Sequence, residues 1–141
     1  MTFRVELKSW EEARSVAGPI RYAVFQETQD EAAGVDLDDL DPQSVHAIAF
    51  DELGNGLGTG RLQPDGQIGR MSVLKDWRRR GVGAAMLQAL IEEARKRGLA
   101  EVTVSAPLRA AEFYREQGFV ADGKVFKQGT TLQQKMRKGL G

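Results

Sequence analysis

The segment WRRRGVGAAM, residues 77–86, combines residue types that together can bind an anion. Three consecutive arginines, Arg78–Arg80, precede Gly81 and Gly83 at the point where helical periodicity begins. The first amides of a helix have no intrahelical partners and carry partial positive charge, and glycine lets a ligand approach the backbone closely. The amides from 79 to 84 could therefore converge on a phosphate group, with the arginines adding charge-assisted hydrogen bonds.

Two other phosphate-binding motifs do not fit this segment. No Gly-Lys-Ser/Thr follows, as a P-loop requires, and GVGAAM lacks the third glycine of a dinucleotide fingerprint. Taken alone, the arginine run leaves two further interpretations open. One is a basic, solvated helix start; the other is a nucleic-acid contact by Arg78–Arg80 together with the basic segment KMRK at 135–138. The zero net charge and the lack of aromatic residues among the arginines argue against nucleic acid.

The composition narrows the class of protein. The chain has 141 residues, 41% hydrophobic and 28% charged, as expected for one globular domain. The absence of cysteine excludes disulfides, thiolate metal sites and a cysteine nucleophile, and is compatible with a cytoplasmic protein. There is no apolar run of membrane-spanning length and no apolar segment near the start, so we expect neither membrane insertion nor secretion.

The hydrophobic pattern predicts a mixed α/β sheet with helices on both faces, in the order β-α-α-β-β-β-α-β-α-β-β. A capping box at Ser9 predicts a helix from Trp10, which Gly18-Pro19 should divide into two pieces. Two more helices are expected after the arginine run and over 108–117, and the acidic stretch 29–44 is expected to be mostly loop. Strands are expected at 2–7, 45–51, 58–62, 67–73, 101–105, 119–127 and 130–136.

A second motif, AAEFYREQGF at 110–119, follows the first. Its A-x-x-F-Y-x-x-x-G-F pattern and the R-R-R-G-V-G-A of 78–84 resemble the two hallmarks of the GNAT superfamily of N-acetyltransferases. Further segments are similar to the ElaA-like subgroup, namely 20–29, 36–46 and 68–73. The resemblance implies a GNAT-like, mostly antiparallel sheet and a single acyl-CoA N-acyltransferase domain over residues 1–141.

The resemblance also implies how acetyl-CoA, as co-substrate, would bind without a metal. The strands 67–73 and 101–105 should splay apart and free backbone groups, so that the pantetheine arm lies against Met71 and Val73. A backbone N–H near Met71–Ser72 should then stabilise the charge that develops on the thioester oxygen. The loop that should hold the pyrophosphate consists of Arg78, Arg79, Arg80, Gly81, Val82, Gly83 and Ala84.

The implied reaction is direct attack by a primary amine, of a small molecule or a peptide, on acetyl-CoA in a ternary complex. The resemblance assigns Tyr114 as the acid that protonates the leaving thiolate. The base stays open between His46, the only histidine, and Glu27 acting through water, and each could instead have only a structural role. The acidic run DLDDLD at 36–41 could attract a cationic amine or be a solvated loop.

Two broader alternatives also remain. The domain could be a catalytically inactive sensor that binds acyl-CoA, and either a monomer or a homodimer is compatible with the sequence.

Overall fold

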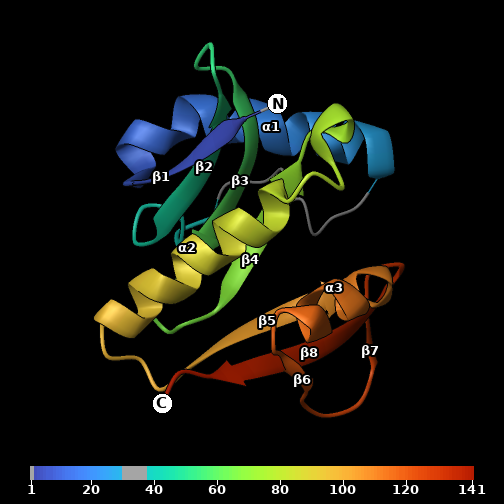
Figure 1. Ribbon diagram of the computed structural model, residues 1–141. Coiled ribbons are helices and arrows are strands. Elements are labelled where there is room, and N and C mark those ends of the chain that lie inside the picture. Colours follow the sequence, from blue (N-terminus) through green and yellow to red (C-terminus); the bar gives the residue numbers. More distant parts are fainter. Residues whose placement is uncertain (1, 30–37) are drawn as a thin grey trace.

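The computed structural model describes residues 2–29 and 38–141 (Figure 1). The α-helices are α1 (Trp10–Thr28), α2 (Val82–Lys96) and α3 (Ala111–Glu116), and short 3-10 turns cover Lys75–Trp77 and Leu108–Ala110. The strands are β1 (Phe3–Lys8), β2 (Val45–Asp51), β3 (Gly56–Leu62), β4 (Ile68–Val73), β5 (Glu101–Pro107), β6 (Val120–Ala121), β7 (Phe126–Gln128) and β8 (Thr131–Gly139).

The strands form two antiparallel sheets that diverge from one point. The first has the order β1-β2-β3-β4, and in the second β8 lies between β5 and β6 and also pairs with β7. Within the described residues the sheets are joined by one parallel bridge between Gln67 and Thr103, where the Thr103 amide donates to the Gly66 carbonyl at 3.1 Å. Figure 1 shows β4 and β5 separating beyond this bridge, which confirms the expected splay.

Helices cover both faces of the first sheet, as predicted. The apolar face of α2 is buried against both sheets, with Val82, Met86, Leu87, Leu90, Ile91 and Ala94 all in the main core. On the opposite face, α1 packs against β2. Ala13 and Ala17 of α1 form a smaller core there with Ile48 and Phe50 of β2. The mixed α/β architecture is therefore confirmed.

The prediction of two helical pieces before residue 29 is wrong, because α1 is continuous and Pro19 lies inside it. A proline in a helix interior removes one hydrogen bond and costs about 3 kcal/mol. The buried face of α1 runs without a break across the proline, at Ala13, Ala17, Ile20, Arg21 and Val24. Packing along this whole face offsets the local cost.

The final third of the chain also differs in detail from the prediction. The expected helix over 108–117 begins with a 3-10 turn, and only Ala111–Glu116 is α-helical. The two expected last strands become β6, β7 and a longer β8, because residues 133–139 of β8 pair with the whole of β5. None of the described helices is long and apolar enough to cross a membrane.

Candidate active site

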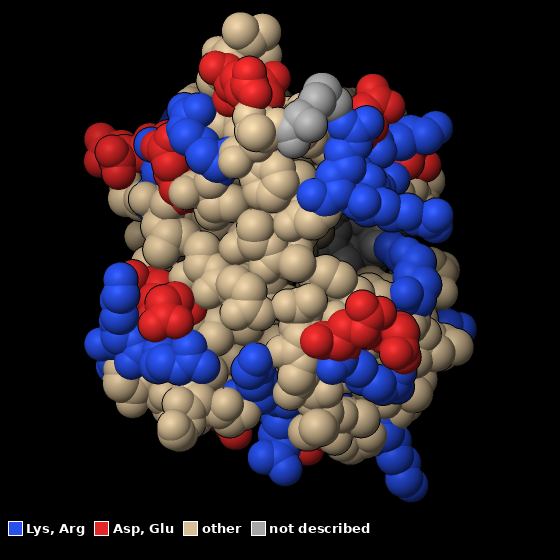
Figure 2. Space-filling view, viewed as in Figure 1, with Lys and Arg blue, Asp and Glu red and all other residues tan. Residues whose placement is uncertain are grey.

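A cleft of about 710 Å³ opens where the two sheets diverge. Figure 2 shows a hollow on the right of the molecule with Lys and Arg side chains gathered around it. Of the ten residues predicted to bind the co-substrate, Arg80 does not line this cleft, and its guanidinium lies 5.2 Å from the centre of the Trp77 ring. The other nine do line it: Met71, Ser72, Val73, Arg78, Arg79, Gly81, Val82, Gly83 and Ala84.

The cleft reaches the start of α2, where backbone amides are left without partners in the helix. Gly81 is the N-cap residue at φ +85°, and Arg79 before it is also left-handed at φ +61°. No side chain caps this end, and the first helical bond runs from the Ala85 amide to the Gly81 carbonyl at 3.0 Å. The three preceding amides, at 82–84, can therefore donate to an anion in the cleft.

Gly83 sits between α3 and β4 on this wall. A Cβ added there would lie 3.6 Å from Phe113 Cζ and 3.9 Å from Val73 Cγ2, which are ordinary contact distances. A methyl group would therefore fit, whereas a branched side chain would extend into the cleft.

Strand β4, which also lines the cleft, carries a bulge. The register with β3 shifts between Ser72 and Gly69, so that Arg70 and Met71 together oppose Gly60. Arg70 has φ +54°, which is uncommon for a residue with a Cβ. Because a bulge interrupts the ladder, the backbone at Arg70 and Met71, which line the cleft, is left out of the regular pairing with β3.

Tyr114 projects from α3 into the same cleft and is 7% exposed. Its ring makes edge contacts with Phe113 and Phe119, at centroid distances of 5.1 and 5.5 Å. Burial raises the pKa of Tyr114 to about 12, so the phenol holds its proton at any physiological pH.

Glu27, a candidate base, is held by Arg78 in a two-pronged ion pair with both N···O distances at 2.6 Å. The Nε of Arg78 also donates to the Val73 carbonyl at 3.0 Å, which fixes the guanidinium against β4. The hydrogen bond from Arg78 lowers the pKa of Glu27, so the carboxylate remains ionised. Glu27 itself does not line the cleft.

His46, the other candidate base, is completely buried beneath Trp10 and away from the cleft lining. Its Nε2 lies 2.9 Å from the Asp41 carbonyl, so Nε2 carries the proton and donates it. Nδ1 is buried without a partner among the described residues, and burial lowers the pKa of the ring. The structure thus holds His46 neutral inside the protein.

We expect His46 to make the protein less stable in mild acid. Because the pKa of His46 is lower in the folded state, the unfolded chain binds the extra proton more readily. The free energy of unfolding should be highest above about pH 6.5 and should decrease as the pH falls below that value. Urea unfolding between pH 8 and pH 5 measures this slope, and His46→Gln should flatten it. An equal slope in the variant would contradict the assignment.

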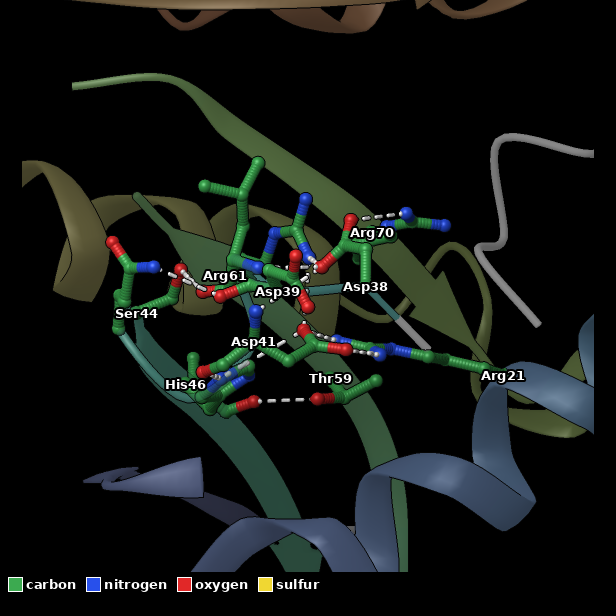
Figure 3. Close-up of polar contacts among 12 residues, drawn as sticks. Arg21, Asp38, Asp39, Asp41, Ser44, His46, Thr59, Arg61 and Arg70 are labelled. Atoms are coloured by element: carbon green, nitrogen blue, oxygen red, sulfur yellow. Dashed lines mark hydrogen bonds and ion pairs between the residues drawn. The ribbon is translucent and has the colours of Figure 1, made fainter. Parts of the chain in front are cut away.

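A buried ionic cluster lies behind the bulge (Figure 3). Asp41 accepts two hydrogen bonds from Arg21, at 2.9 and 3.1 Å, and one from Arg61 at 2.9 Å. Asp38 joins Arg61 to Arg70, with distances of 2.9 and 2.8 Å. The cluster therefore connects α1, the segment after residue 37, β3 and the bulge of β4.

This cluster corrects the interpretation of the acidic run. Asp41 is fully buried and Asp38 is half-buried, and both neutralise arginines of the same chain. They are therefore neither part of a simple solvated loop nor free to attract an amine. Asp36 lies outside the described residues.

Several residues that line the cleft were not identified from the sequence. Phe113 could have been, since it stands beside Tyr114 in the second motif. Trp77 begins the segment 77–86 and could also have been identified, whereas other lining residues, among them Val24, Ser105 and Arg109, carry no local signal and come from distant elements. Across the described residues, no group of three or more His, Cys, Asp or Glu side chains is placed to hold a metal ion.

Comparison with known proteins places this site in context. The model of the acetyltransferase (GNAT) domain family matches residues 14–140. An uncharacterised N-acetyltransferase of Bacillus subtilis, YjcF, is 32% identical over 102 residues, which are 71% of this chain and 73% of YjcF. The crystal structure of a proposed N-acetyltransferase from Lactobacillus plantarum superposes with a TM-score of 0.86 at 26% identity, over 99% of both chains. Escherichia coli ElaA shares the fold, with a TM-score of 0.81 at 18% identity over 97% of this chain and 99% of ElaA.

Proposed function

Since the chain belongs to the acetyltransferase (GNAT) family, we propose that it transfers an acetyl group from acetyl-CoA to a primary amine in a ternary complex. The observation that carries this proposal is the uncapped start of α2, whose amides open onto the cleft. Acetyl-CoA supplies the acetyl group as a reactive thioester.

The residues of the cleft fit this co-substrate. The amides at 82–84 and the side chain of Arg79 would hold the pyrophosphate, because anions bind at helix N-termini. Arg78 is already paired with Glu27 and would shape the loop. The pantetheine arm would lie along β4 against Met71 and Val73, which line the wall opposite α3.

The bulge and Tyr114 would share the chemistry. A backbone N–H near Met71–Ser72 would donate to the thioester oxygen as negative charge develops there. The amine nitrogen forms its bond to the acetyl carbon while the C–S bond breaks, and the amine releases its extra proton to water. The departing sulfur takes the proton of Tyr114, which is later replaced from solvent. Burial raises the pKa of the departing thiol as well as that of the phenol, which offsets the rise in the pKa of Tyr114.

We assign no side-chain base. His46 is buried away from the cleft, and Glu27 is bound to Arg78 with a lowered pKa. The acceptor would therefore have to arrive as the free amine, and the rate should rise with pH until the amine itself has lost its proton.

Binding of acetyl-CoA provides the direct test. At 100 times its dissociation constant, acetyl-CoA should stabilise the fold by about 2.7 kcal/mol and raise the melting temperature by several degrees, whereas ATP and NAD should not. Gly83→Val should weaken acetyl-CoA at least tenfold, because its branched side chain would enter the cleft. Titration calorimetry and thermal melts measure both effects.

Gly139→Val is the matched control, because Gly139 is exposed at the end of β8 with nothing near its Cβ position and should leave acetyl-CoA binding unchanged. If no acyl-CoA shifts the melting temperature of the parent protein, the proposed function is wrong.

A further inference from the structure

A second cavity, of about 190 Å³, adjoins the cleft at the point where the sheets begin to diverge. Four residues, Ile68, Gly69, Arg70 and Ser105, line both the cavity and the cleft. The two spaces therefore meet beside the bulge of β4, where the thioester would be held. A molecule in the small cavity would face the acetyl group from the side away from the pyrophosphate loop.

The walls of the cavity present hydrogen-bond donors that the described residues do not satisfy. Gln63 and Gln133 are 6% and 5% exposed, and their side-chain amides have no hydrogen-bond partner within the described part of the chain. These two amides are accessible to solvent, whereas the Nε of Arg61, which also lines the cavity, is buried without a partner among the described residues, although a buried donor normally has one. Gln67 and Gln128 add two further amides to the same walls.

The charge of the cavity is positive. Arg61 and Arg70 line it, and no Asp or Glu does so among the described residues. Both arginines belong to the ionic cluster, and within the described residues its three arginines pair with two aspartates, Asp38 and Asp41, which leaves this part of the cluster with one net positive charge. Arg61 and Arg70 each use a single Nη atom on the aspartates, which leaves further N–H groups for a ligand.

We propose that this cavity binds the carboxylate of the acceptor, so that the substrate is a small amine that also carries an acid group, such as a free amino acid. This inference rests on the proposed acetyl transfer. Arginine and amide N–H groups suit a carboxylate, which offers two oxygens and about four lone-pair sites. At ~30 Å³ for each water molecule, the cavity has room for about six waters, which is the scale of a small amino acid.

The acid group in the cavity would orient the amine. With its carboxylate on Arg70 and the glutamines, the acceptor can direct its nitrogen through the shared opening toward the bulge. A diamine or polyamine would instead place a second positive charge beside Arg61 and Arg70, which is unfavourable in a half-buried site.

Matched acceptors test this proposal. Release of CoA thiol is measured with free L-amino acids, with the amides of the same amino acids, and with spermidine. For the best amino acid, kcat/KM should exceed that of its amide at least tenfold, mainly through KM, and spermidine should react slowly. Turnover that is equal for acid and amide, turnover confined to spermidine or the amides, or no turnover with any amino acid overturns the inference.

A single charge change sharpens the test. Gln133→Glu keeps the shape of the side chain and adds a negative charge, so it should lower kcat/KM for amino acids at least tenfold and lower the ratio of acid to amide by a similar factor. Gln26→Glu adds the same charge at an exposed position of α1 and should leave the ratio unchanged. An unchanged ratio in Gln133→Glu also overturns the inference.

The binding of acetyl-CoA to the parent protein is measured separately from these rates. If acetyl-CoA binds but the acids show no preference, the inference fails while the proposed co-substrate stands. If acetyl-CoA does not bind, the proposed function fails first.

Discussion

Tyr114→Phe is expected to lower the turnover number for acetyl transfer by about 10²–10⁴, the range typical of a lost general acid. The affinity for acetyl-CoA should stay within about twofold, because the ring still fills the space between Phe113 and Phe119. Since burial raises the pKa of Tyr114 to about 12, the parent enzyme should show no loss of rate from its ionisation up to about pH 10. Steady-state kinetics with a preferred acceptor, together with calorimetry, provide the measurement.

Tyr22 offers a matched control, since it is the other tyrosine in the chain and is 55% exposed on α1. Tyr22→Phe should leave both turnover and binding unchanged. Normal turnover in Tyr114→Phe would mean that water or another group protonates the thiolate. If the parent protein binds acetyl-CoA but acetylates none of a broad panel of amines, the domain would instead be a sensor of acyl-CoA.

Asp41→Asn is expected to reduce the free energy of unfolding by about 3–5 kcal/mol, because it leaves buried cations without their counter-charge. Arg21 and Arg61 are 1% and 4% exposed, and both bind the Asp41 carboxylate. A domain of ordinary stability has only about 5–15 kcal/mol in total, so the melting temperature should fall by roughly 10 °C or more. Urea unfolding followed by circular dichroism measures the change.

Asp39→Asn is the control, because it removes the same charge two residues away. Asp39 is exposed, and its carboxylate has no ion-pair partner among the described residues, so the change should stay within about 0.5 kcal/mol. A loss below 1 kcal/mol in Asp41→Asn would show that water compensates the two arginines.

The part of the cleft proposed to bind the co-substrate could be predicted from sequence because its signals are local. A glycine at the start of a helix and the amides that follow it act through backbone geometry within a few residues. The segment 78–84 therefore predicted an anion-binding role, and nine of the ten residues predicted to bind the co-substrate line the cleft. The second motif placed Tyr114 on a helix in the same way, and the periodicity of α2 identified its buried face.

Other features depended on packing between distant segments. The sequence around Pro19 predicts a break in the helix. The continuous contact of α1 with the first sheet stabilises the unbroken helix by more than the proline destabilises it. His46 reads as a possible base, and only its burial beneath Trp10 shows that it faces away from the cleft.

The amino-acid sequence by itself determined the family, the order of most elements and the segment proposed to bind an anion, since each rests on spacing along the chain. The tertiary structure decided which charges are buried and what the acceptor side of the site contains. Arg21, Asp41 and Arg61 are isolated charged residues in the sequence, where a solvent-exposed position is the ordinary expectation. A charged side chain is stable inside a protein only when it is paired, and here the partners come from other elements of the fold. Contacts between residues far apart in the chain produce no pattern in the sequence.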